Sequence, residues 1–303
     1  MALNLEVVGL ESPPVVRAWD QTDAMLYALG VGAGALDPNH FELEFTTENS
    51  TGVVQRVLPT FATIVGENAL MLSMLGDVDF SKVVHGEQTI SLDGEIPVQG
   101  AVEVRTSVSG IHDKGSGALV VLESVAVDVV SNLRVLTTRM SLFVRGAGGF
   151  GTEDSRESDA DSSLAAETFA SRGPDEVVQY STRPDQALLY RLSGGRSPMH
   201  SDPTFAKMAG FDRPTLHGLC TYGFTGRGLL HLLCESDPRR FGFMRGRFSR
   251  PAFPGDTLKI SVWDVADQSA GTYCFRMENQ NGEVIIDGGL FRLAAVSDSG
   301  AFS

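Results

Sequence analysis

Two halves of the chain repeat the same order of segments, and this repeat constrains the fold more than any other feature. The letters A-M-L-Y-A-L at 24–29 are echoed by A-L-L-Y-R-L at 187–192. L-P-T at 58–60 and R-P-T at 213–215 form a second echo in the same order, each opening a long apolar stretch. Strand-like alternations follow in both halves. We therefore predict a duplication, in which each unit is a long helix laid against an antiparallel sheet.

Alternation of apolar and polar residues predicts the strands of both sheets. Between residues 85 and 144 the alternations are separated by Gly, Pro or Asn turns, which is typical of an antiparallel meander. Helices are expected at 20–30, which stops at Gly30, across 61–75 with Gly66 inside it, and at 214–234. The other expected elements are an extended lead-in over 1–18, a short strand at Phe41–Thr47, a short helix at Asp202–Ala209, and strands at Gln88–Leu92, Ala101–Val108, Ala118–Val130, Leu133–Val144, Gly242–Ser249, Thr257–Val265, Gly271–Gln280 and Glu283–Ala295.

Residues 146–175 separate the two halves. Gly, Ser and acidic residues dominate this stretch and no apolar period survives, so it predicts a linker or long loop. The expected units are an N-terminal domain at 1–148, a linker at 149–176 and a C-terminal domain at 177–303. With 303 residues, of which 42% are hydrophobic, each unit is long enough to bury its own core.

Composition excludes several classes of function. The net charge of −14 gives no nucleic-acid footprint, so an anionic ligand requires a local cluster of Arg or Lys. No apolar run is long enough to span a membrane, and no secretory signal is visible. Cys220, Cys234 and Cys274 are odd in number and lie in apolar patterns, which predicts reduced, buried thiols in a cytoplasmic protein. The His and Cys residues show no metal-ligand spacing, and no phosphate-binding loop or nucleophile elbow occurs.

The most distinctive motif follows the first echo in the second half. Residues 190–200 read Y-R-L-S-G-G-R-S-P-M-H, and L-H-G-L occurs at 216–219. Together with L-P-T-F at 58–61, H-G-E-Q at 85–88 and F-P-G-D at 253–256, these segments resemble the type 2, (R)-specific 2-enoyl-CoA hydratases, or MaoC-like dehydratases, in their double-hotdog form.

The resemblance implies both a fold and a substrate. The fold is α+β, a double hotdog with two antiparallel sheets, each wrapped around a long central helix. The first hotdog would make room for an acyl chain and the second would carry the catalytic turn. The substrate would be an acyl thioester of coenzyme A or of a carrier, so that coenzyme A is part of the substrate and no separate cofactor is expected. The resemblance also implies a homodimer.

The catalytic turn of that family runs Ser-Gly-Asp-x-Asn-Pro-x-His, and this chain departs from it twice. The histidine is present as His200, but Gly195 stands at the position of the aspartate and Ser197 at that of the asparagine. A general acid or base contributes about 10²–10⁴-fold to rate, so the missing carboxylate predicts a reduced or altered activity. His200 alone remains a base near neutral pH. Its other reading is a hydrogen bond at the start of the following helix.

Other polar residues near the turn are weaker candidates. Asp202 precedes Pro203 and is expected to cap a helix rather than to act as the acid. Asp185 and Glu87 lie beside a turn or strand, where a carboxylate is usually only solvated. Ser197 is expected to bond either to water or His200, or to its own backbone.

Gly218 begins the long helix, so its N–H is an unpaired donor at the positive helix end. By resemblance it points at the thioester oxygen, where one donor contributes about 3 kcal/mol; otherwise the glycine lets the helix approach the sheet. His217 is expected to be a packing residue. The basic residues near this site are candidates for the coenzyme A phosphates, or else a solvated strand face: Arg227, Arg245, Arg247 and Arg250.

Two functions remain open from the sequence. The first is a hydratase or 3-hydroxyacyl-thioester dehydratase whose acid comes from another group. The second is a non-catalytic or repurposed acyl-thioester-binding protein, or an inactivated variant of a hydratase. A designed knockout usually changes one residue, whereas both Gly195 and Ser197 depart here, which favours natural divergence.

Overall fold

Ten strands form one antiparallel sheet in the computed structural model, which describes residues 3–37, 39–68, 70–79, 82–151, 160–265 and 270–295. The strands of the first half are β1 (Val15–Trp19), β2 (Val83–Leu92), β3 (Gly100–Asp113), β4 (Gly117–Asp128) and β5 (Arg134–Arg145). Those of the second half are β6 (Glu176–Ser181), β7 (Phe241–Phe248), β8 (Thr257–Asp264), β9 (Thr272–Asn279) and β10 (Val284–Leu293).

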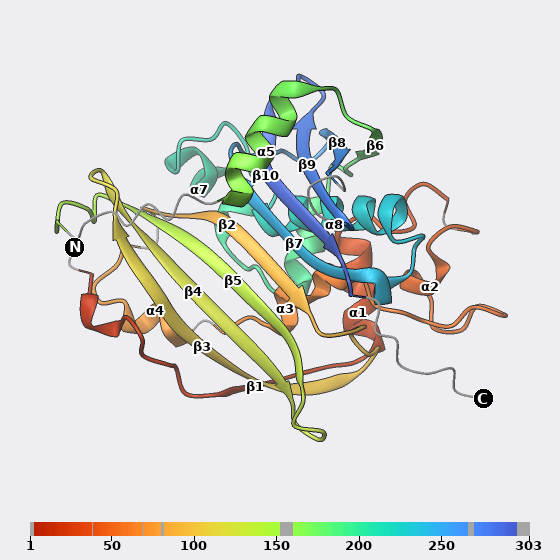
Figure 1. The fold of residues 1–303 in the computed structure, drawn as a ribbon, viewed down its shortest axis with the longest axis horizontal. Coiled ribbons are helices and arrows are strands. Elements are labelled where there is room, and N and C mark those ends of the chain that lie inside the picture. Colours follow the sequence, from red (N-terminus) through yellow and green to blue (C-terminus); the bar gives the residue numbers. More distant parts are fainter. Residues whose placement is uncertain are drawn as a thin grey trace.

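The strand order shows the duplication directly. It runs β1-β3-β4-β5-β2-β7-β10-β9-β8-β6, so each strand of the first half has its counterpart at the mirrored place in the second. β2 and β7 pair antiparallel at the centre, from Glu87 opposite Arg247 to Ser91 opposite Phe243. The two predicted sheets are therefore joined edge to edge into one (Figure 1). The meander strands that alternation predicted are all present.

The two echoed letter patterns also occupy equivalent places. The first echo forms α1 (Gln21–Gly30) and α6 (Gln186–Tyr190), which pack against each other with the Tyr27 and Tyr190 rings 6.1 Å apart. The Asp20 carboxylate accepts hydrogen bonds from the backbone N–H groups of Thr22 and Asp23, which fixes the start of α1. The buried tyrosine pair forms part of the contact between the two halves.

α8 (Gly218–Leu233) is the central helix of the whole molecule. It lies behind β7 and β10 in Figure 1 and is buried along most of its length. A Cβ at Gly223 would lie 2.4 Å from Val31 Cγ1, and one at Gly226 would lie 2.2 Å from Thr60 Cγ2. Glycine at these positions lets the backbone of α8 approach the first half closely. One helix therefore packs against both units.

The first half differs from the prediction of a long helix in each unit. The stretch expected to be helical forms a 3-10 turn (Pro59–Phe61), α3 (Ala62–Val65) and, further on, α4 (Leu70–Met74). The helix stops at Gly66, where a Cβ would lie 2.7 Å from Thr138 Cγ2 of β5. The double hotdog is confirmed, but the described residues of the first half contain no helix as long as α8.

Three further expectations were wrong in detail. Phe41–Thr47 contains the short helix α2 (Leu43–Thr46) instead of a strand, and the lead-in contains β1. The predicted linker contains α5 (Ala160–Ser171), which packs in front of β9 and β10 (Figure 1). Neighbouring residues of β9 show why α5 is held: Phe275 belongs to the main core, while Cys274 belongs to a second cluster under α5. The remaining helix, α7 (Pro203–Met208), matches the prediction.

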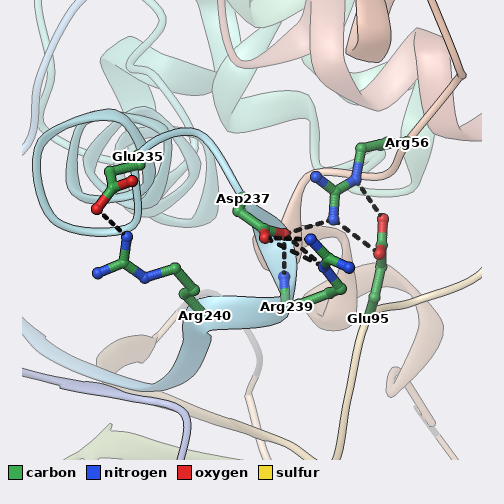
Figure 2. A network of polar contacts seen from close by, with 6 residues as sticks. All are labelled: Arg56, Glu95, Glu235, Asp237, Arg239 and Arg240. Carbon is green, nitrogen blue, oxygen red and sulfur yellow. Dashed lines mark hydrogen bonds and ion pairs between the residues drawn. The ribbon is translucent and has the colours of Figure 1, made fainter. Parts of the chain in front are cut away.

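A polar network ties the first half to the end of α8 (Figure 2). Arg56 Nε lies 2.7 Å from Glu95 Oε1, and its Nη2 lies 2.6 Å from Asp237 Oδ1. Arg239 pairs with the same Asp237 carboxylate, and the hydrogen bonds from Arg239 and Arg56 lower the pKa of Asp237 despite its partial burial.

Cys220, Cys234 and Cys274 are buried and form no disulfide bond, as expected. Within the described ranges, no helix is long and apolar enough to cross a membrane.

Candidate active site

One cavity lies between the two halves, next to the turn that carries His200. Its volume is about 240 Å³, a little below the range typical of small-molecule sites. Residues of α3, of the segment after it and of β2–β5 line one side. Gly195, His200, His217 and Gly218 line the other side. The broken helix of the first half thus borders the same space as the predicted catalytic turn.

His200 is held in one orientation by the backbone. It ends the 3-10 turn Pro198–His200, and its Nδ1 lies 3.0 Å from the Thr215 carbonyl oxygen and 3.2 Å from the Thr215 hydroxyl. Because a carbonyl oxygen only accepts, Nδ1 carries the proton and Nε2 keeps a lone pair. Burial lowers the pKa of His200, which keeps the ring neutral.

His217 packs face to face with His200 and fixes the turn before it. The ring centroids are 3.8 Å apart with an interplanar angle of 29°. His217 Nε2 donates to the Gly195 carbonyl oxygen at 2.7 Å. Burial lowers the pKa of His217 to about 3, and the repulsion that a protonated His200 would exert lowers it further. His217 therefore packs, as expected, and also shapes the cavity wall.

Gly218 places the N-terminus of α8 at the cavity. The first N–H groups of a helix lack intrahelical partners and lie at its positive end. A Cβ at Gly218 would lie 3.3 Å from Phe248 Cε1, so the glycine also lets α8 approach β7. The close approach expected of Gly218 is confirmed, and the role of its N–H toward a thioester oxygen stays a prediction.

Comparison with known proteins identifies the family. The protein-family model described as the MFE-2 hydratase 2 N-terminal domain matches residues 18–146, and the family model described as the MaoC like domain matches residues 166–283. A Mycobacterium tuberculosis protein named 3-hydroxyacyl-thioester dehydratase Y is 39% identical over 303 residues, which cover 97% of this chain and 100% of that relative. A second protein of that organism, named enoyl-CoA hydratase ChsH3, is 38% identical and covers 87% of this chain and 90% of the relative. The chain belongs to the MaoC-like hydratase and dehydratase family.

Solved structures of MaoC-like proteins share this fold. A MaoC-like dehydratase from Phytophthora capsici has a TM-score of 0.80 and 27% identity, and covers 97% of this chain and 100% of that chain. The peroxisomal multifunctional enzyme type 2 of Drosophila melanogaster has a TM-score of 0.74 and 32% identity, covering 93% of this chain but 48% of that longer one. A Mycobacterium tuberculosis protein described as a double hotdog, 15% identical with a TM-score of 0.53, shares the fold across 93% of this chain and 96% of its own.

This MaoC-like chain lacks the turn carboxylate, and the space near Gly195 is occupied. A Cβ at Gly195 would lie 2.8 Å from His217 Cδ2, so an aspartate there would require the ring of His217 to move. Ser197 is exposed, and its hydroxyl accepts a hydrogen bond from the Met199 N–H at 3.4 Å. Ser197 therefore bonds its own backbone, the second of the two roles expected for it.

The other predicted carboxylates do not line the cavity. Asp202 caps α7 by accepting from the Thr204 N–H at 2.8 Å and from the N–H of Phe205, as expected. Asp185 is exposed and pairs with Arg183 at 2.9 Å. Glu87 lies on β2 opposite Arg247 and is outside the residues that line the cavity.

The four arginines predicted as a basic cluster do not share one surface, and the prediction that two of them bind coenzyme A phosphates was wrong. Arg227 is 1% exposed and pairs with Glu42 at 2.8 Å inside the core. Arg245 is 8% exposed, so it too is buried. Both lie among apolar neighbours in sequence, a signal that favours burial. Arg247 and Arg250 are exposed and have carboxylate partners on β10 and just before it, Asp287 and Glu283.

Sequence reasoning missed several polar residues of the cavity, among them His85, Gln88 and Glu67. His85 and Gln88 of β2 line it, although their segment carried only the family resemblance. Burial lowers the pKa of His85 to about 4, and its ring packs on Phe248 with centroids 4.9 Å apart. Glu67 also lines the cavity, from a segment predicted to be helical. Among the residues that the structure describes, no cluster of His, Cys, Asp or Glu fits a metal ion.

Proposed function

We propose that this chain is an (R)-specific 2-enoyl-CoA hydratase, or in the reverse direction a 3-hydroxyacyl-thioester dehydratase. The observation that carries the proposal is His200, whose Nδ1 is bound by Thr215 so that Nε2 keeps its lone pair in a cavity also lined by the start of α8. The names of the relatives, enoyl-CoA hydratase and 3-hydroxyacyl-thioester dehydratase, support the same reaction.

In this proposal His200 carries one proton from water to the substrate. The oxygen of a water molecule bonds to C3 of the enoyl thioester, while His200 Nε2 takes one proton from that water. The electrons of the C2=C3 bond move onto the thioester oxygen, where the N–H of Gly218 stabilises the negative charge. The imidazolium of His200 then returns the proton to C2, which forms the 3-hydroxyacyl thioester. A neutral imidazole, as burial favours, is the required starting form.

The walls of the cavity indicate where the acyl group lies. Apolar side chains from the first half, such as Leu122 and Met140, alternate with hydroxyl groups of Thr106, Ser124 and Thr138. We propose that this side receives the acyl group while coenzyme A stays outside, near the exposed Arg247 and Arg250. The hydratase needs no cofactor in this proposal, and we expect a cytoplasmic homodimer.

A turnover assay tests the proposed function. The purified chain is mixed with a trans-2-enoyl-CoA, loss of the conjugated enoyl absorbance is followed, and the chirality of the 3-hydroxyacyl product is determined. Wild type is expected to form the (R) product, and His200→Ala is expected to lose about 10²–10⁴-fold in kcat. Binding of acyl-CoA without turnover would instead support a thioester-binding protein, which the occupied position beside Gly195 favours as the second candidate.

A further inference from the structure

We propose that Glu67, from the first half, supplies the carboxylate that the catalytic turn of the second half lacks. The inference rests on the proposed hydratase function and assigns a second catalytic residue to it. In this arrangement the Glu67 carboxylate accepts a hydrogen bond from the reacting water across the cavity, and His200 acts as the base from the turn itself.

The position of the carboxylate carries the proposal. Glu67 Oε2 lies 3.6 Å from the point where a Cβ of Gly194 would stand, directly before Gly195. The Gly195 carbonyl is bound to His217, and His217 packs on His200, so Glu67 and the base both border the turn at residues 194–200. Of the described residues that line the cavity, Glu67 is the one with a carboxyl group.

Local structure holds Glu67 in place. Gly66 ends α3, so Glu67 leaves the helix and turns toward the cavity. Arg17 Nε donates to the Glu67 carbonyl oxygen at 2.9 Å, and its Nη2 lies 3.7 Å from Glu67 Oε2. The pKa of Tyr190, a cavity residue, is raised mainly by burial, with smaller contributions from Tyr27, Cys220 and the Glu67 carboxylate.

The side chain has the solvation that this role requires. It is 48% exposed, so the carboxylate lies at the mouth of the cavity and stays hydrated. It can accept a hydrogen bond from the second hydrogen of the attacking water, while the first passes to His200 Nε2 as the oxygen bonds to C3. The carboxylate also offsets the positive charge that His200 carries until it returns the proton to C2. No other reactant is consumed.

The test compares Glu67→Gln with a matched surface variant. Glu103 on β3 is 40% exposed and pairs with Arg105 at 2.6 Å, so Glu103→Gln also removes one carboxylate from an exposed ion pair, but outside the cavity. We expect Glu67→Gln to lower kcat on a trans-2-enoyl-CoA by about 100-fold or more, with Glu103→Gln equal to wild type. Circular dichroism checks that both variants are folded. We expect both to fold, because the replaced side chains are exposed.

The outcomes separate the two proposals. If wild type shows no turnover, the hydratase function itself is wrong. If wild type turns over and Glu67→Gln retains more than about a hundredth of its kcat, the function stands and the role of Glu67 is overturned. A loss of the same size in Glu103→Gln also overturns it, because the effect would then follow surface charge.

Discussion

Two turns at equivalent places in the duplicated halves have different surroundings. The turn after α1, at residues 31–34, is filled by charged side chains in the core. Arg227 of α8 donates to the Val31 carbonyl oxygen and pairs with Glu42 at 2.8 Å. The Glu42 carboxylate also accepts from the Gly34 N–H at 2.8 Å and from His231 Nε2 at 2.8 Å.

The turn after α6, at residues 193–200, opens instead onto the cavity. Its imidazole, His200, is held by Thr215 and not by a buried charge. Burial opposes the ionisation of Glu42, but His231 and Arg227 outweigh it and lower its pKa, so the first turn holds a stable buried ion pair. One copy of the turn therefore joins the two halves through buried charges, and the other copy borders the cavity.

The largest expected loss of stability comes from removing the arginine side chain that fills the turn at residues 31–34. Arg227→Ala leaves Glu42 buried without its charged partner, so we expect the free energy of unfolding to fall by about 3–5 kcal/mol. Urea denaturation followed by circular dichroism measures the change. Arg247→Ala, which breaks an exposed pair on β7, should cost at most about 1 kcal/mol. Equal costs for the two variants would contradict the distinction between the turns.

A smaller effect distinguishes the glycines of the two turns. Gly32 has φ +79°, and a Cβ there would lie 2.5 Å from Phe224 Cε1, so Gly32→Ala combines backbone strain with overpacking. We expect it to cost about 1–3 kcal/mol. Gly195 has no positive φ, and its Cβ would meet only the edge of the His217 ring, so Gly195→Ala adds a close side-chain contact without the backbone strain of Gly32→Ala. Thermal unfolding of the two variants should therefore show the lower Tm for Gly32→Ala, and the reverse order would contradict the comparison.

The smallest expected effect is a shift in the pH profile. Burial lowers the pKa of His200, so the folded protein favours the neutral ring. Its contribution to stability is thus present above the ordinary histidine pKa of about 6.5 and is lost as the pH falls below it. We expect kcat/KM to stay level down through pH 6.5 and then to fall about tenfold per pH unit. An acid limb that begins above pH 7 would show that His200 is not the neutral base.

Local patterns made much of the fold predictable. Alternation located the meander strands, and the letters from Ser193 to His200 carried part of the family resemblance, because both signals lie within a few neighbouring residues. The cap at Asp202 followed from its place before Pro203.

Contacts between distant residues explain what the sequence did not reveal. Arg227 meets a carbonyl 196 residues away, so its burial depends on how the halves pack. The interruption at Gly66 and the turn of Glu67 toward the cavity likewise depend on β5 and Arg17. α5 is held by the face of β9 and β10 beneath it, which the composition of its segment does not show.

The turn at residues 31–34 is filled by core side chains and the turn at residues 193–200 borders the cavity, so the stoichiometry of thioester binding tests the difference between them. Calorimetric titration with a saturated acyl-CoA, which binds without reacting, measures it directly. We expect one thioester per chain, and we expect the same stoichiometry with weaker binding in Ile64→Trp, which enlarges a side chain on the cavity wall. Two thioesters per chain, or none, would contradict it.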